Sequence, residues 1–130
     1  MRPVLKPKKK SPHYLHAAAV IIQRGRVLLA LRPSKGLLGG MWEFPNARAA
    51  VDPGRELAKT INAAYKLRVK RKSALGVVQH AYTHFKVTVH AFWCEAVAIP
   101  KDKNLKWVRV DELDNYPMGK VDRAISQKIK

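Results

Sequence analysis

The sequence contains a single cysteine, Cys94, and few acidic residues. One cysteine excludes an internal disulfide and is compatible with a reducing compartment. Only 9 Asp and Glu residues accompany 26 Lys and Arg residues, so the formal net charge is +17. A surface this basic favours a polyanionic partner, and nucleic acid is the commonest polyanion.

Long apolar runs are also absent. No run approaches the ~18 residues that a membrane-spanning helix needs. No basic amphipathic helix with a broad aromatic face favours an anionic membrane as partner. Residues 1–5 lack the apolar core of a signal peptide. We therefore expect no membrane partner and a bacterial-type cytoplasm, at the nucleoid, or another compartment that holds DNA.

The chain length predicts one folded domain behind a basic tail. The 130 residues, of which 47% are hydrophobic, suit one domain with a substantial core. Residues 1–12 combine lysines and prolines with no acid, which predicts an extended linker or tail that either solubilises the chain or contacts phosphates. Such an opening suggests that other sequence precedes it. We expect the folded domain to span residues 13–130.

Apolar periodicity and turn residues predict the order of the elements. Residues 17–22 and 27–32 are expected to pair as a hairpin around Gly25. Asp52 as N-cap and Pro53 predict a helix that runs to about Lys66. The remaining expected elements are a short strand at residues 42–45, a basic strand at 66–72, strands at 73–80 and 84–95, a strand at 105–110, a helical turn at 111–114, and a terminal helix with an apolar stripe of Val121, Ala124, Ile125 and Ile129.

The loop between the strands at 73–80 and 84–95 carries three adjacent side chains that suit base recognition: Tyr82, Thr83 and His84. In the second strand, apolar residues from Phe85 to Trp93 alternate with polar ones, which predicts a half-buried antiparallel strand. An aromatic ring can stack on or wedge beside a base, and a hydroxyl can both donate and accept a hydrogen bond. The plain alternative is that Tyr82 and Thr83 only suit a β-rich segment.

Other conspicuous side chains favour structural roles. We expect four aromatic residues at strand positions to pack in the core rather than stack on bases: Trp42, Phe44, Trp93 and Trp107. Four histidines are interpreted as plain polar residues, because no cysteine or carboxylate spacing joins them into a metal site: His13, His16, His80 and His90.

The stretch Leu-Leu-Gly-Gly-Met-Trp-Glu-Phe-Pro at residues 37–45 resembles the loop and strand that precede the Nudix box in Nudix domains. It is most similar to the version in the C-terminal domain of MutY-type adenine DNA glycosylases. Residues 32–38 resemble that family's entry to the loop, and residues 82–85 resemble its Phe-Ser-His or Phe-Thr-His loop. Residues 111–113 and 116–118 resemble its C-terminal pattern, and the basic opening resembles its interdomain linker. The resemblance implies a single-domain α+β Nudix-like fold, with a mixed or antiparallel β-sheet flanked by helices.

The sequence departs from the hydrolytic members of the family at the metal site. Their box glutamates hold Mg²⁺ through carboxylate oxygens. In this sequence the corresponding positions are Thr60, Ala63 and Ala64, and only Glu56 remains on the helix. Glu43 is interpreted as a structural hydrogen-bonding residue rather than a remnant of a substrate site. We therefore expect no metal ligand and no catalytic residue in this chain.

The glycosylase chemistry is absent as well. The family's catalytic domain carries a 4Fe–4S cluster held by four cysteines, and one cysteine cannot ligate it. The resemblance thus implies the recognition domain alone, without a cofactor, acting as a monomer with the catalytic domain of the same protein. Its implied partner is duplex DNA that contains 8-oxoguanine opposite adenine.

The resemblance implies the site residues. Thr83 is expected to read the edge of 8-oxoguanine, Tyr82 to wedge beside it, and His84 to brace the loop or touch the backbone. Candidates for phosphate contacts are Lys35, Arg68, Lys70, Lys72 and Lys86.

Two other functions stay open. One is a divergent Nudix nucleotide pyrophosphohydrolase that uses acids outside the box, such as Glu56, Glu95 or Glu112. The other is a basic RNA- or ribosome-associated protein, which the net charge permits.

Overall fold

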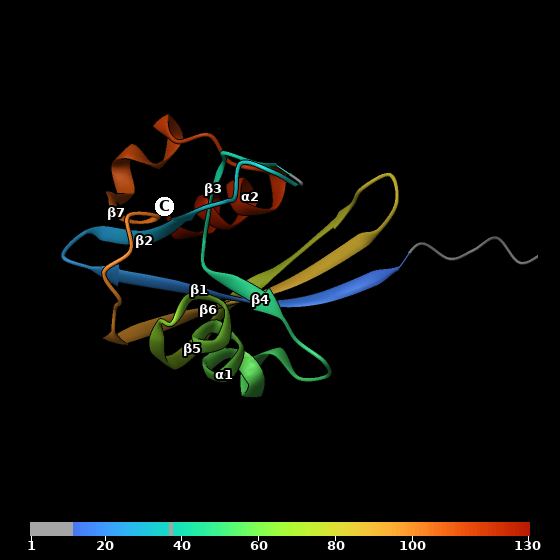
Figure 1. Ribbon diagram of the computed structural model, residues 1–130, viewed down its shortest axis with the longest axis horizontal. Helices are drawn as coiled ribbons and strands as arrows, with labels where there is room; N and C mark the ends of the chain where they lie inside the picture. The colour runs from blue at the N-terminus through green and yellow to red at the C-terminus, as the bar shows by residue number, and fades with distance from the viewer. Residues whose placement is uncertain (1–11, 37) are drawn as a thin grey trace, which may run out of the picture.

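The computed structural model describes residues 12–130 except residue 37 (Figure 1). Residues 1–11, and with them most of the predicted basic tail, lie outside the described residues. Within the described part, no helix is long and apolar enough to cross a membrane.

The chain opens with the predicted hairpin of β1 (His13–Gln23) and β2 (Arg26–Leu31). The two turn residues between them, Arg24 and Gly25, have φ angles of 53° and 75°. Positive φ at both positions is typical of the type I′ turns that suit the twist of antiparallel strands. The expectation for Gly25 is therefore confirmed.

The strands form one mixed sheet in the order β3–β2–β1–β6–β5, with β4 paired to β1 and β7 paired to β2. β1 and β6 run parallel, and the other pairs are antiparallel. The other strands are β3 (Trp42–Glu43), β4 (Asn46–Arg48), β5 (Arg68–Ala81), β6 (Lys86–Ala98) and β7 (Leu105–Arg109). The predicted α+β class with a mixed sheet is confirmed.

The predicted strand at residues 84–95 pairs antiparallel with the strand before it, as expected, but the prediction that it is half-buried is wrong. β6 is a central strand, antiparallel to β5 and parallel to β1, and helices cover both faces of its later part. Val87 and Val89 belong to one apolar cluster, while Phe92 and Cys94 belong to the other. The parallel pairing joins residues far apart in the sequence, so local alternation could not show it.

Two further details differ from the prediction. The basic strand at 66–72 and the strand at 73–80 form one long strand, β5, whose register shifts between Arg71 and Gly76. The three-residue strand β4, which directly follows Pro45, was not predicted.

Helices cover the two faces of the sheet (Figure 1). α1 (Pro53–Tyr65) begins at Asp52, whose Oδ1 accepts a hydrogen bond from the Arg55 N–H at 3.2 Å, as the sequence predicts. Its buried Leu57 and Ile61 pack in the cluster of Phe92 and Cys94. On the opposite face, α2 (Lys120–Ile129) follows the short 3₁₀ helix η1 (Val110–Asn115) and packs against the cluster of Val87 and Val89.

The four predicted core aromatics pack against these clusters to different depths. Phe44 is fully buried, whereas the three tryptophans are half-buried at the edges of the clusters. Trp42 meets Tyr116 edge-on, with ring centroids 5.8 Å apart. Their roles are structural, as predicted.

Candidate functional site

The β5–β6 hairpin extends beyond the two helices and ends in the segment 82–85 (Figure 1). The Tyr82 N–H donates to the Phe85 carbonyl at 2.7 Å and closes the turn. Thr83 and His84 are exposed at the tip, while Tyr82 and Phe85 are half-buried. The structure therefore separates the predicted trio: two side chains lie at the surface and Tyr82 lies in a wall beneath it.

The wall is a row of planar groups. The rings of Tyr82 and Phe85 stack at 4.7 Å with 29° between their planes, and Tyr14 lies 5.5 Å from Phe85. The Arg48 guanidinium lies 4.2 Å from the centre of the Tyr14 ring. His80 meets Tyr82 edge-on at 4.5 Å. Such contacts hold each ring in one orientation.

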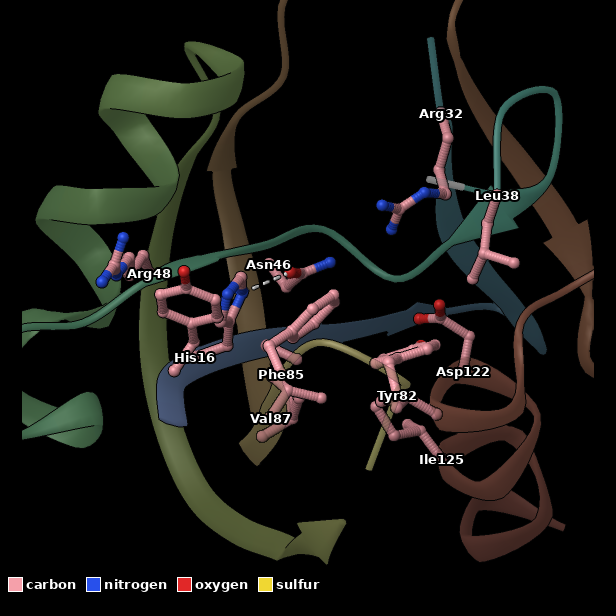
Figure 2. Close-up of a pocket in the computed structure, with 14 residues that line it drawn as sticks. His16, Arg32, Leu38, Asn46, Arg48, Tyr82, Phe85, Val87, Asp122 and Ile125 are labelled. Carbon is pink, nitrogen blue, oxygen red and sulfur yellow. Dashed lines mark hydrogen bonds between the residues drawn. The ribbon is translucent and has the colours of Figure 1, made fainter. Parts of the chain in front are cut away.

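The rings of Tyr14, Tyr82 and Phe85 line a cavity of about 340 Å³ between the sheet and α2 (Figure 2). This volume is within the range of small-molecule sites. Val87, Val89 and Ile125 supply apolar lining, and Leu38 from the β2–β3 loop lies at its side. The polar lining consists of His16, Arg32, Asn46, Arg48 and Asp122.

Glu43 holds two residues of the cavity lining, Arg32 and Asn46, through a partly buried hydrogen-bond network. Arg32 Nη1 donates to its carboxylate at 2.7 Å and Asn46 Nδ2 donates at 3.1 Å. The Tyr65 hydroxyl donates to its other oxygen at 3.0 Å. Burial, together with the negative charge of Glu43, raises the pKa of Tyr65. The structural interpretation of Glu43 is confirmed.

Asp122, at the start of α2, is a cavity residue that the sequence analysis missed. Its side chain is 6% exposed, and its Oδ1 accepts a hydrogen bond from the Phe44 N–H at 3.1 Å. The carboxylate points toward the side of the cavity where Arg32 lies (Figure 2). Burial, reinforced by Glu43, raises its pKa to about 7. The sequence signal for this role was an acidic residue directly after Val121, which belongs to the apolar stripe of the helix. An acid is common in the first turn of any helix, so the signal did not point to a cavity.

Only one of the predicted phosphate contacts lies next to the tip. Lys86 directly follows the segment 82–85 as the first residue of β6, whereas Lys35 is exposed in the β2–β3 loop. Arg68, Lys70 and Lys72 lie at the opposite end of β5, roughly 30 to 45 Å from the tip at about 3.3 Å per residue. Lys72 also pairs with Glu95 at 3.0 Å.

Comparison with known proteins identifies the family of the fold. Residues 17–128 match the NUDIX domain family. The chain belongs to this family. Among solved structures, this NUDIX domain is similar to the MutT protein of Methanosarcina mazei Go1, with a TM-score of 0.77 and 19% identity over 92% of this chain and 94% of that one.

Several curated relatives of this NUDIX domain are adenine DNA glycosylases. It is 28% identical to the human enzyme over 98 residues, which are 67% of this chain and 18% of that protein. It is 25% identical to the Schizosaccharomyces pombe enzyme over 103 residues, which are 70% of this chain and 22% of that protein. The domain thus spans about a fifth of the length of these relatives.

A glycosylase domain is also among the similar structures. The C-terminal domain of mouse MUTYH, solved in complex with human PCNA, superposes with a TM-score of 0.69 and 23% identity over 89% of this chain and 86% of that one. The resemblance to the C-terminal domain of adenine DNA glycosylases, predicted from the sequence, is confirmed.

The described residues of this NUDIX domain form no carboxylate cluster that fits Mg²⁺. On α1, Ala63 and Ala64 are exposed and carry no oxygen ligand, and the Thr60 hydroxyl donates to the Leu57 carbonyl. The carboxylate of Glu56 accepts from the N–H groups of residues 50, 51 and 52 at 2.7, 2.8 and 2.6 Å, and these bonds lower its pKa.

The other acids proposed for hydrolysis lie apart from Glu56. Glu95 is on β6, where it pairs with Lys72, and Glu112 is on η1, 3.9 Å from Arg109. Nowhere in residues 12–36 and 38–130 do three His, Cys, Asp or Glu side chains group so as to hold a metal ion.

Proposed function

We propose that this NUDIX domain acts in DNA repair as the lesion-recognition domain of an adenine DNA glycosylase. In this proposal it binds duplex DNA and reads 8-oxoguanine opposite adenine, while a catalytic domain of the same protein removes the adenine. The observation that carries the proposal is the hairpin tip, where the exposed Thr83 and His84 lie between the stacked rings of Tyr82 and Phe85. The chain is also related to these glycosylases.

The chemistry of the lesion suits the tip. Guanine N7 is a hydrogen-bond acceptor, whereas N7 of 8-oxoguanine carries a hydrogen and donates. Thr83 reads this edge through its hydroxyl and its backbone, and His84 braces the loop or touches the DNA backbone. One or two such bonds supply about 1–3 kcal/mol of discrimination.

Tyr82 contributes from the side of the cavity. Its ring is stacked on Phe85, so it wedges beside the lesion with a fixed face rather than as a free side chain. A base that turns toward the cavity meets this face and the carboxyl of Asp122. The raised pKa of Asp122 leaves a substantial protonated fraction near neutral pH, which can donate a hydrogen bond to a base oxygen.

Replacing Thr83 tests the reading role. With the chain joined to the catalytic domain of an adenine DNA glycosylase, Thr83→Val should lower the preference for 8-oxoguanine:A over G:A about tenfold, because valine keeps the shape but loses the hydroxyl. The matched control is Thr60→Val on α1, which should leave the preference unchanged. An unchanged preference ratio in Thr83→Val would count against the assignment.

A nucleotide hydrolase is the second candidate, favoured by the fold likeness to MutT. The missing α1 acids argue against it, so we expect no Mg²⁺-dependent turnover of 8-oxo-dGTP or of a panel of nucleoside diphosphate compounds. Turnover that is lost on Glu56→Gln, Glu95→Gln or Glu112→Gln would support the hydrolase instead.

A basic RNA-binding protein is distinguished by its preference among polyanions. Duplex DNA and a structured RNA are compared at several salt concentrations, because non-specific attraction weakens steeply with salt. An RNA preference that survives high salt would contradict the DNA-repair proposal.

A further inference from the structure

The β5–β6 hairpin also has a polar face on the side opposite the aromatic cavity, which we call the reverse face. Side chains alternate between the two faces of a strand. Tyr14 and Val87 therefore face the aromatic cavity, whereas their neighbours His13, Lys86 and Thr88 face the reverse side. α1 covers this reverse side only farther along β6, at Phe92 and Cys94. Among the described residues, nothing packs over the end near the tip.

Strand register brings the groups of the reverse face together. Lys86 lies between His13 of β1 and Ala81 of β5, and Thr88 lies next to Gln79. Together they line a second cavity of about 260 Å³. None of its lining residues is an acid.

Two of the polar side chains in this cavity hold each other in place, and two others are free to bind a ligand. His13 Nε2 and Thr88 Oγ1 are 2.6 Å apart, and Thr88 is only 6% exposed, so the buried hydroxyl fixes the imidazole ring. The Lys86 ammonium and the Gln79 amide are exposed and, among the described residues, make no hydrogen bond or ion pair. A cation, an amide and a fixed imidazole thus converge without a counter-charge.

This donor set fits an oxyanion better than a metal ion. His13 already uses its Nε2 toward Thr88, and nothing in the described chain supplies a cluster of three metal-ligating side chains here. Lysine and amide N–H groups bind phosphate oxygens and cannot bind a metal cation.

The position of this cavity near the tip favours a phosphate of the DNA strand as its ligand. Lys86 is two residues from His84, which is about 7 Å along a strand. A tip that contacts one nucleotide therefore places this cavity within reach of the backbone beside it. We propose that His13, Gln79, Lys86 and Thr88 form a phosphodiester-binding site that fixes the register of the hairpin on DNA. This inference rests on the proposed function and adds the contact that positions the reading tip.

The salt dependence of duplex-DNA binding tests this phosphate site directly. Each phosphate contact that is lost lowers the slope of log K against log salt by about 1. The whole chain is titrated with duplex DNA at several salt concentrations, as wild type, Lys86→Gln, His13→Gln and Thr88→Val. Lys103→Gln, an exposed lysine in the loop before β7, is the matched control. Thermal melting verifies that each variant is folded.

The expected result is a slope about 1 smaller for Lys86→Gln, weaker binding for His13→Gln and Thr88→Val, and no change for Lys103→Gln. The weakening should be equal for 8-oxoguanine:A and G:A duplexes, because a phosphate carries no base identity. Folded Lys86→Gln and His13→Gln variants with the slope and affinity of the wild type would overturn the site.

The two proposals fail separately in this design. A slope change without any Thr83→Val effect on lesion preference would contradict the reading role alone. A Thr83→Val effect without a slope change would contradict the phosphate site alone. No measurable binding of duplex DNA by the wild type would overturn the phosphate site as well.

Discussion

At the scale of single residues, Asp122 illustrates how surroundings set protonation. It accepts a hydrogen bond from the Phe44 N–H, and burial dominates its pKa. Folding therefore favours the neutral form of Asp122 relative to the unfolded chain. A neutral carboxyl can donate a hydrogen bond, which a carboxylate cannot do.

The raised pKa of Asp122 predicts a specific dependence of stability on pH. The folded chain holds this proton more tightly than the unfolded chain, so the contribution to stability is fully present below the ordinary pKa of about 3.8 and is lost as pH rises to about 7. Asp122→Asn keeps an acceptor for the Phe44 N–H but does not titrate. The variant should match the wild type near pH 4 and exceed its free energy of unfolding at pH 8 by a few kcal/mol, on the order of 1.4 kcal/mol per pKa unit.

Chemical denaturation of both proteins across this pH range is the check. Parallel pH profiles for wild type and Asp122→Asn would show that Asp122 ionises normally in the folded chain. The donor role of its carboxyl would then be contradicted.

At the scale of elements, the hairpin is rigid because its rings bridge it to β1. Phe85 touches Tyr82 on one side and Tyr14 on the other. The Tyr82 N–H to Phe85 carbonyl bond then holds the tip in a single turn. Recognition by exposed side chains needs such support, because a loose loop loses entropy when it binds.

Phe85→Ala tests this support. The change removes two aromatic contacts worth about 0.5–1.5 kcal/mol each, in addition to buried apolar area, so we expect a loss of about 2–3 kcal/mol in stability. Phe85→Leu keeps most of the volume and should lose less. Thermal melting measures the loss, and amide hydrogen exchange at residues 82–85 should accelerate in the alanine variant. Unchanged exchange at the tip would mean that the rings do not hold it.

Local patterns predicted the elements that local interactions form. The β1–β2 turn needed Gly25, and α1 needed Asp52 and Pro53, and all three are visible in a short stretch of sequence. The pairing of β1 with β6 and the place of β4 depend on contacts between residues far apart in the chain. No periodicity carries that information.

The site was predicted in part for the same reason. Thr83 and His84 follow each other in one loop, so their exposure could be expected from the turn. The cavity is assembled from β1, the β2–β3 loop, the hairpin and α2, and Tyr14, Arg48 and Asp122 meet only in the folded chain. The prediction that Arg68, Lys70 and Lys72 contact phosphates rests on charge alone, and the length of β5 separates these residues from the tip.

At the scale of the whole molecule, the net charge of +17 supplies attraction without selectivity. The chain spans about a fifth of the length of its curated relatives, so in the proposed protein another domain holds and bends the duplex. Joined to that domain, the tip acts at a high effective concentration. The isolated chain should bind duplex DNA weakly, at roughly micromolar or weaker affinity near physiological salt, with a small preference for the lesion and no release of adenine.

The most direct test of the central claim is a nuclear magnetic resonance titration of this chain with matched, G:A and 8-oxoguanine:A duplexes. All three duplexes should shift amide signals on the reverse face of the hairpin, because they share a backbone. The difference between the 8-oxoguanine:A and G:A duplexes should concentrate at residues 82–85, with Thr83 and His84 most affected. Identical shifts at these residues for the two duplexes, or a lesion-dependent response located elsewhere in the domain, would contradict the assignment of the tip as the reader of the lesion.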